Sequence, residues 1–159
     1  DAMLFMSVIS GRNSHYLIGE QVIAAPIVRD LNIETISTGY ILLDGGSCST
    51  VEFMSGTRPI PLNRVDIIIA HALAGQYLGM DCIYLESGSG AEIPVTSEVV
   101  SAVKESINIP IIVGGGIKSP EKASELVKAG ASIIVSGTNV ERKSSIMSEM
   151  SDAVHWKKT

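Results

Sequence analysis

The chain has 159 residues, which fits one domain, and its 45% apolar against 18% charged residues excludes an intrinsically disordered protein. Its 12 basic and 17 acidic residues leave a formal net charge of −5, which excludes a basic nucleic-acid-binding surface as the main function. Because aromatic residues make up only 4% of the chain, the core has to be built from aliphatic side chains, as in a parallel sheet covered by helices.

Apolar segments with strand and helix periodicity alternate along the whole chain. They predict, in chain order, a strand at 2–9, a helix at 13–29, strands and helices alternating at 35–43, 65–78, 82–86, 99–107, 109–113, 119–130 and 132–136, and a final helix from about Glu141. Asn13 and Ser119 are expected to cap their helices, and Gly79 to end the helix before it.

Several local features qualify this pattern. The first strand is expected to be buried, and Pro26 to kink or shorten the first helix, in which Ile18 and Val22 share a face. After the Asp44-Gly45-Gly46 turn, residues 50–54 are predicted to return as a hairpin arm. The final helix is expected to direct four apolar residues inward, namely Ile146, Met147, Met150 and Val154.

The alternation of strands and helices predicts right-handed parallel βαβ units in an α/β fold. Two closures fit it: an open flavodoxin-like sheet, or part of a TIM (β/α)₈ barrel. A complete barrel takes about 250 residues, and the first apolar strand begins at residue 2. We therefore expect residues 1–159 to be the C-terminal portion of a single barrel domain, holding its last five βα units, with strands 1–3 outside the chain.

Glycine clusters follow three successive predicted strands, as Gly88-Ser89-Gly90, Gly114-Gly115-Gly116 and Gly137-Thr138. Glycine allows backbone amides to approach an anion closely. The carboxyl ends of parallel strands are also where ligands bind in such folds. One cluster alone could be only a tight turn, whereas the three together favour a phosphate-binding lining.

Glu86 stands at the end of an apolar strand, where an acid is either a surface charge or a residue facing a ligand. Tyr84 lies two positions earlier, so both side chains point to the same side of the sheet. A carboxylate and a phenol beside an anion site could bind a substrate hydroxyl, and the carboxylate could accept its proton.

The remaining polar residues are weaker candidates for a functional site. Arg58 and Lys118 could reach phosphate groups or lie in solvent, and His71, on an apolar helix face, fits a core or interface position better than a catalytic one. Cys48 and Cys82 have no metal-type spacing and fit reduced thiols of a cytoplasmic protein. No apolar run reaches the roughly 18 residues of a membrane span.

These motifs resemble those of the geranylgeranylglyceryl phosphate synthases, which are related to the heptaprenylglyceryl phosphate synthases. The resemblance covers essentially the whole chain. The most specific segment is Tyr84-Leu85-Glu86-Ser87-Gly88-Ser89-Gly90-Ala91. It is supported by Phe5-Met6-Ser7-Val8, Thr38-Gly39-Tyr40, Arg58-Pro59-Ile60-Pro61, Ala74-Gly75-Gln76-Tyr77-Leu78-Gly79-Met80, Val113-Gly114-Gly115-Gly116-Ile117 and Gly137-Thr138-Asn139-Val140-Glu141.

The resemblance implies a TIM barrel and a prenyltransferase. Such an enzyme joins the C3 hydroxyl of sn-glycerol 1-phosphate to C1 of geranylgeranyl diphosphate and releases pyrophosphate, forming the first ether bond of archaeal membrane phospholipids. Glu86 would then contact the glycerol hydroxyl and help to remove its proton. Glycerol phosphate would be held by Tyr84, Leu85, Glu86, Ser87, Gly88, Ser89, Gly90, Gly115, Gly116, Gly137 and Thr138.

The resemblance also implies a cofactor and partners. The family uses Mg²⁺, whose ligands lie on the first two barrel strands, so we expect no metal ligands in this chain and poor activity from the chain alone. Oligomers of identical subunits and a transient membrane association for the lipid product are expected. Two alternatives stay open: another phosphate-binding barrel isomerase or synthase, which leaves Tyr84-Leu85-Glu86 unexplained, and a catalytically incomplete phosphate-binding fragment.

Overall fold

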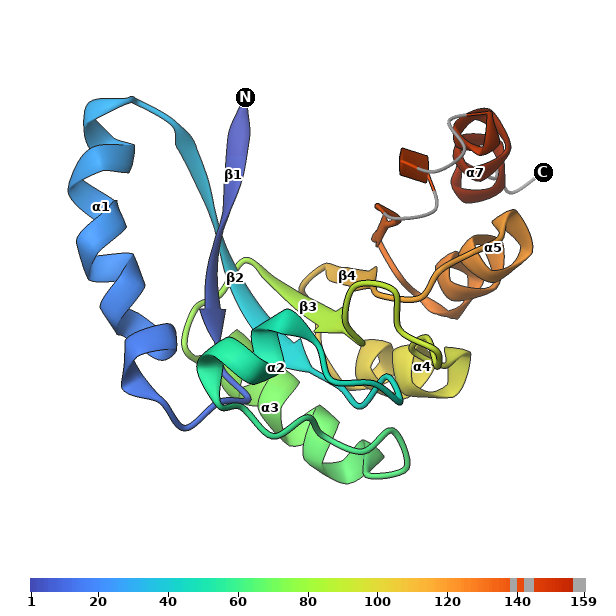
Figure 1. Ribbon diagram of the computed structural model, residues 1–159, viewed down its shortest axis with the longest axis horizontal. Helices are drawn as coiled ribbons and strands as arrows, with labels where there is room; N and C mark the ends of the chain where they lie inside the picture. Colours follow the sequence, from blue (N-terminus) through green and yellow to red (C-terminus); the bar gives the residue numbers. More distant parts are fainter. Residues whose placement is uncertain (138–139, 142–144, 156–159) are drawn as a thin grey trace.

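The computed structural model describes residues 1–137, 140–141 and 145–155. Strands and helices alternate as predicted, with one additional helix, α2 (Figure 1). The elements are β1 (Ala2–Val8), the π-helix η1 (His15–Gly19), α1 (Glu20–Asp30), β2 (Glu34–Leu42), α2 (Thr50–Ser55), α3 (Val65–Tyr77), β3 (Cys82–Glu86), α4 (Ser97–Ser106), β4 (Ile111–Gly114), α5 (Pro120–Ala129), β5 (Ile133–Val135) and α7 (Ile146–Val154).

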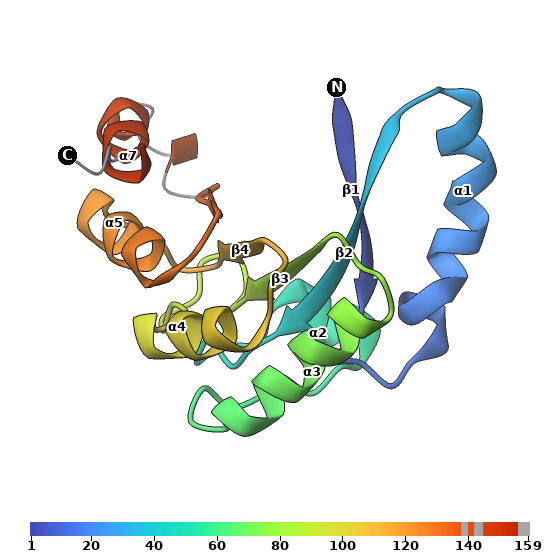
Figure 2. The ribbon, with the colours of Figure 1, turned by 180° about the vertical axis from the view of Figure 1, so that it is seen from behind.

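The five strands form one parallel sheet in the order β1-β2-β3-β4-β5. Each strand pairs with the next one in sequence, so successive right-handed crossovers carry the connecting helices to one side of the sheet. Figure 2 shows α3 and α4 in front of the sheet on this side. A doubly wound sheet reverses its strand order at a switch point. The flavodoxin-like alternative is therefore wrong, and the five units form a segment of a (β/α)₈ barrel.

The register of the strands separates two apolar faces. Ile41 lies beside Leu85 and Tyr40 beside Tyr84 across the β2–β3 pair, and neighbours along a strand point to opposite faces. The face toward the helices holds the main core, in which Ile41 and Leu85 are fully buried. The opposite face, which is the inner side of the barrel segment, carries a smaller cluster of Tyr40, Leu42, Cys82, Tyr84 and Ile112.

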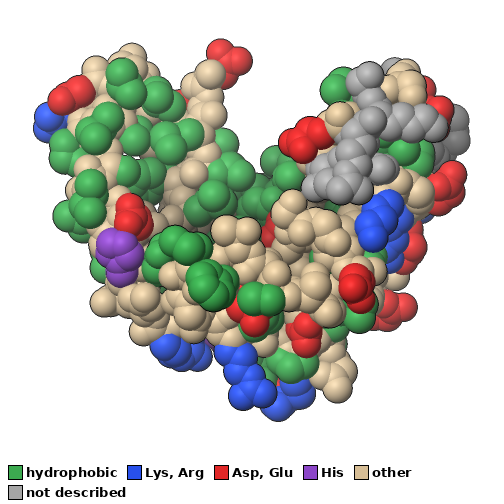
Figure 3. All heavy atoms as spheres, viewed as in Figure 1, with side chains coloured by type: hydrophobic (Ala, Val, Ile, Leu, Met, Phe, Trp, Pro, Cys, Tyr) green, Lys and Arg blue, Asp and Glu red, His purple; other side chains and the backbone are tan. Residues whose placement is uncertain are grey.

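β1 has the predicted strand conformation, but the expectation that it is buried is wrong. Met3 and Met6 are 36% and 41% exposed, and Ile18 and Val22, on the apolar face expected for the first helix, are 57% and 65% exposed. Figure 3 shows hydrophobic side chains over α1 and β1 along one side of a deep hollow. The periodicity predicted strand and helix correctly, but burial requires a covering element, and no described element packs on this side.

Residues 50–54 are helical, so the predicted hairpin arm is wrong. They belong to α2, where the Ser49 side chain accepts a hydrogen bond from the Glu52 amide as a helix cap. Gly56 ends the helix with a φ of 63°, a left-handed conformation suited to glycine. The β-branched and aromatic residues of the segment 50–54 favour a strand. The helix forms instead because Ser49 caps its first turn and Gly56 ends it.

Two other expectations about helices need correction. Pro26 lies inside α1, which continues to Asp30, so the proline does not shorten the helix as one form of the prediction had it. Asn13 accepts a hydrogen bond from the His15 amide and so supports the start of η1, although the residue before η1 is Ser14. In α7, Met150 is buried as predicted, whereas Met147 is 58% exposed. Residues 142–144, in the predicted final helix, lie outside the described residues.

Candidate functional site

A cavity of about 460 Å³ lies at the carboxyl ends of the strands. It brings the three glycine clusters together, although they are separated in sequence, and Glu86 and Tyr84 line it from β3. This is the arrangement that the sequence predicted for the ends of parallel strands. The lining residues are Tyr40, Ser49, Thr50, Val51, Tyr84, Glu86, Gly88, Ser89, Gly90, Gly115, Gly116, Ile117, Lys118, Val135, Ser136 and Gly137.

Glu86 is a pocket residue and not a surface charge, since it is only 8% exposed. Its Oε1 atom accepts a hydrogen bond of 2.8 Å from the Gly88 amide, and the Tyr84 hydroxyl donates a second one to the carboxyl group. Burial raises the pKa of the Glu86 carboxyl above its ordinary value, while these two hydrogen bonds lower it in part. A carboxylate of raised pKa is a better proton acceptor near neutral pH than an exposed glutamate.

Two tyrosines stand beside this carboxyl group. The rings of Tyr40 and Tyr84 have centroids 5.2 Å apart and are tilted by 59°. Burial raises the pKa of both phenols well above the ordinary range, and the negative charge of Glu86 raises it further. Both hydroxyls therefore stay protonated at neutral pH; the Tyr84 hydroxyl donates to the carboxyl group, and the Tyr40 hydroxyl keeps a proton that it can donate.

Gly114 and Gly115 leave the space in which Glu86 and Tyr84 sit. A Cβ atom on Gly114 would lie 2.5 Å from Glu86 Oε2 and 2.6 Å from the Tyr84 hydroxyl. A Cβ atom on Gly115, whose φ is 87°, would lie 2.6 Å from Glu86 Oε1 and 2.7 Å from the Gly88 amide nitrogen. Glycine is therefore required here by the close approach of two neighbouring loops as well as by the backbone conformation.

Gly137 has a different reason to be a glycine. Among the described residues, a Cβ atom there would meet nothing closer than Glu141 Oε1 at 3.8 Å, an ordinary contact distance. Packing against the protein therefore does not require a missing side chain at this position. Gly137 lines the cavity, so the missing side chain leaves its backbone accessible from the cavity.

The structure places most, but not all, of the predicted binding residues on the cavity. Leu85 and Ser87 do not line it: the Leu85 side chain packs in the core toward the helices, and Ser87 is 1% exposed. The Leu85 side chain is therefore turned away from the cavity, and the Ser87 hydroxyl is buried with no hydrogen-bond partner among the described residues. Thr138 lies outside the described residues.

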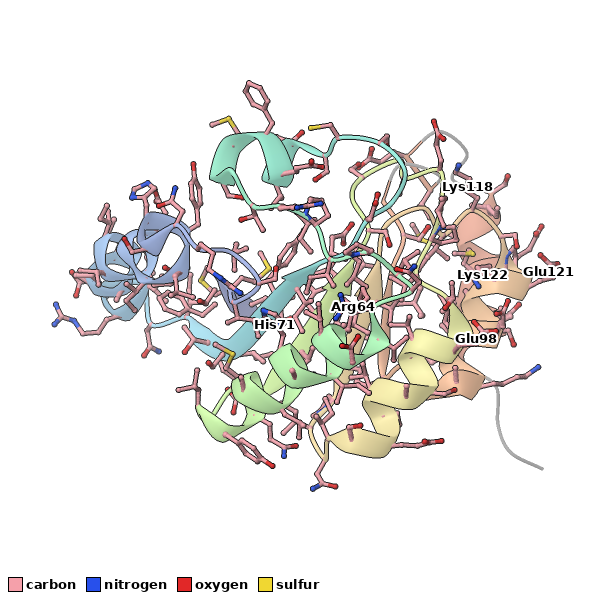
Figure 4. The ribbon with its side chains drawn as sticks, turned by 90° about the horizontal axis from the view of Figure 1, so that it is seen from below. Arg64, His71, Glu98, Lys118, Glu121 and Lys122 are labelled. Atoms are coloured by element: carbon pink, nitrogen blue, oxygen red, sulfur yellow. The ribbon has the colours of Figure 1, made fainter. Side chains whose placement is uncertain are left out.

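Of the weaker candidates, only Lys118 reaches the cavity. Figure 4 shows Lys118 on the loop that precedes α5, away from His71 on α3. Arg58 is exposed on the loop after α2 and does not line the cavity. His71 is half-buried, and its Nδ1 atom lies 2.8 Å from the Ile67 carbonyl oxygen within α3, which fits the expected structural role.

Replacing Leu85 by alanine should separate a structural role from a binding role. The variant is expected to lose about 2–5 kcal/mol of unfolding free energy, because it leaves a cavity in a fully buried position. The KM for a phosphate-bearing substrate should stay unchanged, since the side chain faces away from the cavity. Urea unfolding and steady-state kinetics measure the two effects, and a raised KM with unchanged stability would contradict this assignment.

The sequence did not indicate the contributions of β2 and α2 to the site. Tyr40, Thr50 and Val51 line the main cavity and also a second pocket of about 220 Å³ with mainly apolar side chains. The other residues of this second pocket are Met6, Val8, Tyr16, Met54 and Ser55. The position of Tyr40 on the same face as Tyr84 could have indicated it, but α2 was interpreted as a strand.

The described residues do not fit a magnesium site. No group of three or more His, Cys, Asp or Glu side chains among them could hold a metal ion. Of the described residues that line the main cavity, Glu86 alone carries a carboxyl group, and burial raises its pKa. Mg²⁺ is commonly held by ionised carboxylates together with waters and substrate phosphates, and a single buried carboxyl group of raised pKa, already hydrogen-bonded to Tyr84 and Gly88, is a poor ligand for it.

In the part of the chain that the structure describes, every helix is too short or too polar to cross a bilayer.

Comparisons with known proteins agree on one family. The profile described as the PcrB family matches residues 1–156. A geranylgeranylglyceryl phosphate synthase from Chitinophaga pinensis is 50% identical over 155 residues, which are 98% of this chain and 62% of that relative. These matches confirm the family resemblance predicted from the glycine-rich motifs.

Solved structures give the same result. Wild-type GGGPS from Thermoplasma volcanium superimposes with a TM-score of 0.91 at 34% identity, over 100% of this chain and 64% of that one. The (S)-3-O-geranylgeranylglyceryl phosphate synthase from Thermoplasma acidophilum, in complex with sn-glycerol-1-phosphate, superimposes with a TM-score of 0.89 at 38% identity. This match covers 97% of this chain and 62% of that one. The chain thus spans less than two thirds of the length of these relatives.

Proposed function

Because the chain belongs to the PcrB family, we propose that it forms the acceptor-binding side of a prenyltransferase active site. The reaction joins the C3 hydroxyl of sn-glycerol 1-phosphate to C1 of geranylgeranyl diphosphate and releases pyrophosphate, as a step in ether-lipid biosynthesis. The observation that carries the proposal is Glu86, a buried carboxyl group of raised pKa inside a cavity walled by glycine-rich loops.

The cavity supports one orientation of glycerol phosphate. The backbone of Gly115, Gly116 and Gly137 offers the anion site, and the glycerol unit then extends toward Glu86 and Tyr84. The Glu86 carboxylate takes the proton of the C3 hydroxyl while that oxygen forms the new bond to C1 of the prenyl group. The bond between C1 and the diphosphate breaks at the same time, and pyrophosphate leaves with the electron pair.

The apolar pocket supports a prenyl donor as the second substrate. It adjoins the main cavity at Tyr40, Thr50 and Val51, so an apolar chain can lie in it while the carbon to be attacked faces Glu86. A wholly polar substrate, as in the alternative isomerase or synthase, has no use for such a pocket. No step is assigned to a metal ion, because the described residues do not fit one.

An isotope experiment tests this function directly. The natural full-length polypeptide is incubated with sn-glycerol 1-phosphate that carries ¹⁸O in its C3 hydroxyl, together with prenyl diphosphates of several lengths. Mass spectrometry should find an ether product that retains the label, and the sn-glycerol 3-phosphate control should give much less product. Label loss, or release of unmodified prenyl alcohol alone, would contradict the proposed bond formation.

Gly137→Ala tests the phosphate site. The variant is expected to keep the stability of the wild type, because a methyl group there meets only an ordinary contact. Its affinity for glycerol phosphate should fall by roughly tenfold or more, the equivalent of one lost hydrogen bond to a charged group. Calorimetric titration measures the affinity, and an unchanged value would place the phosphate elsewhere.

The expected subunit association and cytoplasmic location stay predictions. Sedimentation of the natural polypeptide would test the first, and cell fractionation the second.

A further inference from the structure

The short helix α2 exposes its most apolar side chains to solvent. Phe53 and Met54 are 79% and 61% exposed, although the opposite side of the same helix is anchored by Ser55, which is 3% exposed. Figure 3 shows hydrophobic side chains lying over α2 on the face that contains the hollow. A protruding phenyl and thioether pair contributes nothing to the core of the protein.

Two arginines that form no ion pair with a described acidic residue lie close to α2. The Arg12 guanidinium donates to the Ser10 and Gly11 carbonyl oxygens of its own loop, which leaves its charge without an acidic partner there. The loop after β1 contacts the end of α2, since the Asn13 side chain donates to the Ser55 carbonyl oxygen at 3.4 Å. In the same contact, a Cβ atom on Gly11 would lie 2.8 Å from Thr57 Oγ1. Arg12 follows Gly11 and Arg58 follows Thr57, which places both exposed arginines at this contact.

The charge of these arginines is not neutralised within the described part of the chain. Neither Arg12 nor Arg58 forms an ion pair with a described acidic residue, whereas the nearby Arg64 is paired with Asp66 at 2.8 Å. The chain as a whole has a net charge of −5, so a surface with two arginines that lack a described acidic partner, beside two exposed apolar residues, differs from the rest of the chain in its charge. Figure 3 shows Lys and Arg side chains along the lower edge of the same face.

The apolar pocket connects this surface with the candidate active site. Met54 and Ser55 line the pocket on the α2 side, and Tyr40 and Val51 are shared with the main cavity. An apolar chain that enters beside α2 therefore reaches Glu86 without crossing the polar phosphate side of the cavity.

We propose that Phe53, Met54, Arg12 and Arg58 form a docking surface for an anionic lipid bilayer. The proposal rests on the proposed function, which requires a substrate and a product with long apolar chains that reside in membranes. Aromatic and apolar side chains enter the boundary between headgroups and acyl chains, while arginines bind anionic headgroups. The surface thus delivers the prenyl substrate to the pocket and returns the product to the bilayer.

The larger apolar surface on α1 does not suit this partner. Its exposed residues, such as Val22 and Ile27, are accompanied by Glu20 and Asp30, which are paired with His15 and Arg29, and by the exposed acid Glu34, which an anionic bilayer repels. Among the described residues, the α1 surface therefore offers a bilayer no arginine free of an acidic partner, whereas Arg12 and Arg58 beside α2 outnumber its one acid, Glu52. Charge complementarity therefore selects α2 over α1.

Vesicle flotation with the natural full-length polypeptide tests the proposal. Wild type is expected to bind vesicles of phosphatidylglycerol and phosphatidylcholine, to bind phosphatidylcholine alone weakly, and to dissociate as salt is raised. The double variant R12Q/R58Q should bind about thirtyfold more weakly, because the binding free energies of two arginine–headgroup contacts are lost together. Phe53→Ser should bind about tenfold more weakly or worse, because it removes one inserted aromatic side chain.

Matched controls lie at the other end of the sheet and on α1. Leu78→Ser removes an equally exposed apolar side chain, 77% exposed, and should bind like wild type. Arg29→Gln removes an exposed arginine that is already paired with Asp30 at 2.8 Å, and it should also bind like wild type. Phe53→Ser should also keep wild-type transfer from the short, soluble dimethylallyl diphosphate without vesicles.

Three results would overturn the proposal: no flotation of the wild type, unchanged flotation of Phe53→Ser, or an altered sedimentation coefficient of that variant, which would make the surface a protein interface. Transfer activity is measured separately, so loss of the proposed function would be seen in the wild type without vesicles.

Discussion

Replacement of Glu86 by glutamine is expected to lower kcat for prenyl transfer by about 100- to 10,000-fold, the usual contribution of a positioned proton acceptor. Glutamine has the same shape and can still accept the hydrogen bond that the Gly88 amide donates to Glu86 Oε1. The KM for glycerol phosphate should therefore change little. Steady-state kinetics of the natural polypeptide provide the measurement.

The pH dependence gives a second signature of the same residue. Burial raises the folded-state pKa of Glu86, so wild-type activity should rise with pH as the carboxyl group ionises, and Glu86→Gln should lack this limb. Stability should follow the opposite course. The protonated Glu86 carboxyl group contributes its full stabilisation of the folded wild type below the unfolded-state pKa. This contribution to the unfolding free energy is lost as the pH rises through the folded-state pKa of Glu86.

Glu86→Gln removes this loss, because glutamine does not ionise. Relative to wild type, the variant should become more stable as the pH rises, although its activity is nearly gone. Urea unfolding at several pH values measures the difference. A variant that is equally destabilised at all pH values would indicate a structural carboxylate, and retained kcat would remove Glu86 from the mechanism.

Gly115→Ala is expected to damage both stability and activity. The left-handed backbone at a φ of 87° costs a non-glycine residue about 1–3 kcal/mol. The new methyl group also lies 2.6 Å from Glu86 Oε1 and 2.7 Å from the Gly88 amide nitrogen, so the carboxyl group has to move. A displacement of about 1 Å in a catalytic group costs about 100-fold in rate.

Gly90→Ala is the matched control for this variant. Gly90 has a φ of 74°, but a Cβ atom there meets no atom of the described residues within 4 Å. Gly90→Ala therefore introduces the same kind of backbone strain as Gly115→Ala, but its methyl group does not collide with Glu86. The difference in unfolding free energy and in kcat between the two variants isolates the effect of displacing Glu86, and equal effects would show that strain alone is responsible.

Periodicity predicted the strands and most helices, because each apolar repeat belongs to a single segment. It could not decide between an open sheet and a barrel, since the order in which strands pair is a property of the whole chain. The exposure of Met6 and Val22 to solvent could not be predicted from the sequence either. An apolar pattern indicates which face of an element is to be covered, but not which element covers it. The place of residues 1–159 within a larger domain stays a prediction.

For the site, the glycine clusters and the parity of Tyr84 and Glu86 were sufficient to predict where the cavity lies. The same parity argument, applied to Leu85, would have excluded its side chain from the cavity, since it faces the helices. Tyr40 and α2 were missed because they enter the site through strand pairing and a helix cap. Neither is visible in the sequence segment around Glu86.

The hydrogen bond from the Gly88 amide to Glu86 Oε1 has a further consequence for binding. The side chain and the glycine-rich loop hold each other in one conformation before any ligand arrives. The rotational entropy of the carboxylate, and part of that of the loop, is therefore lost during folding and not during catalysis. With Oε1 engaged in this way, the proposed proton acceptor has its direction set before a substrate hydroxyl arrives.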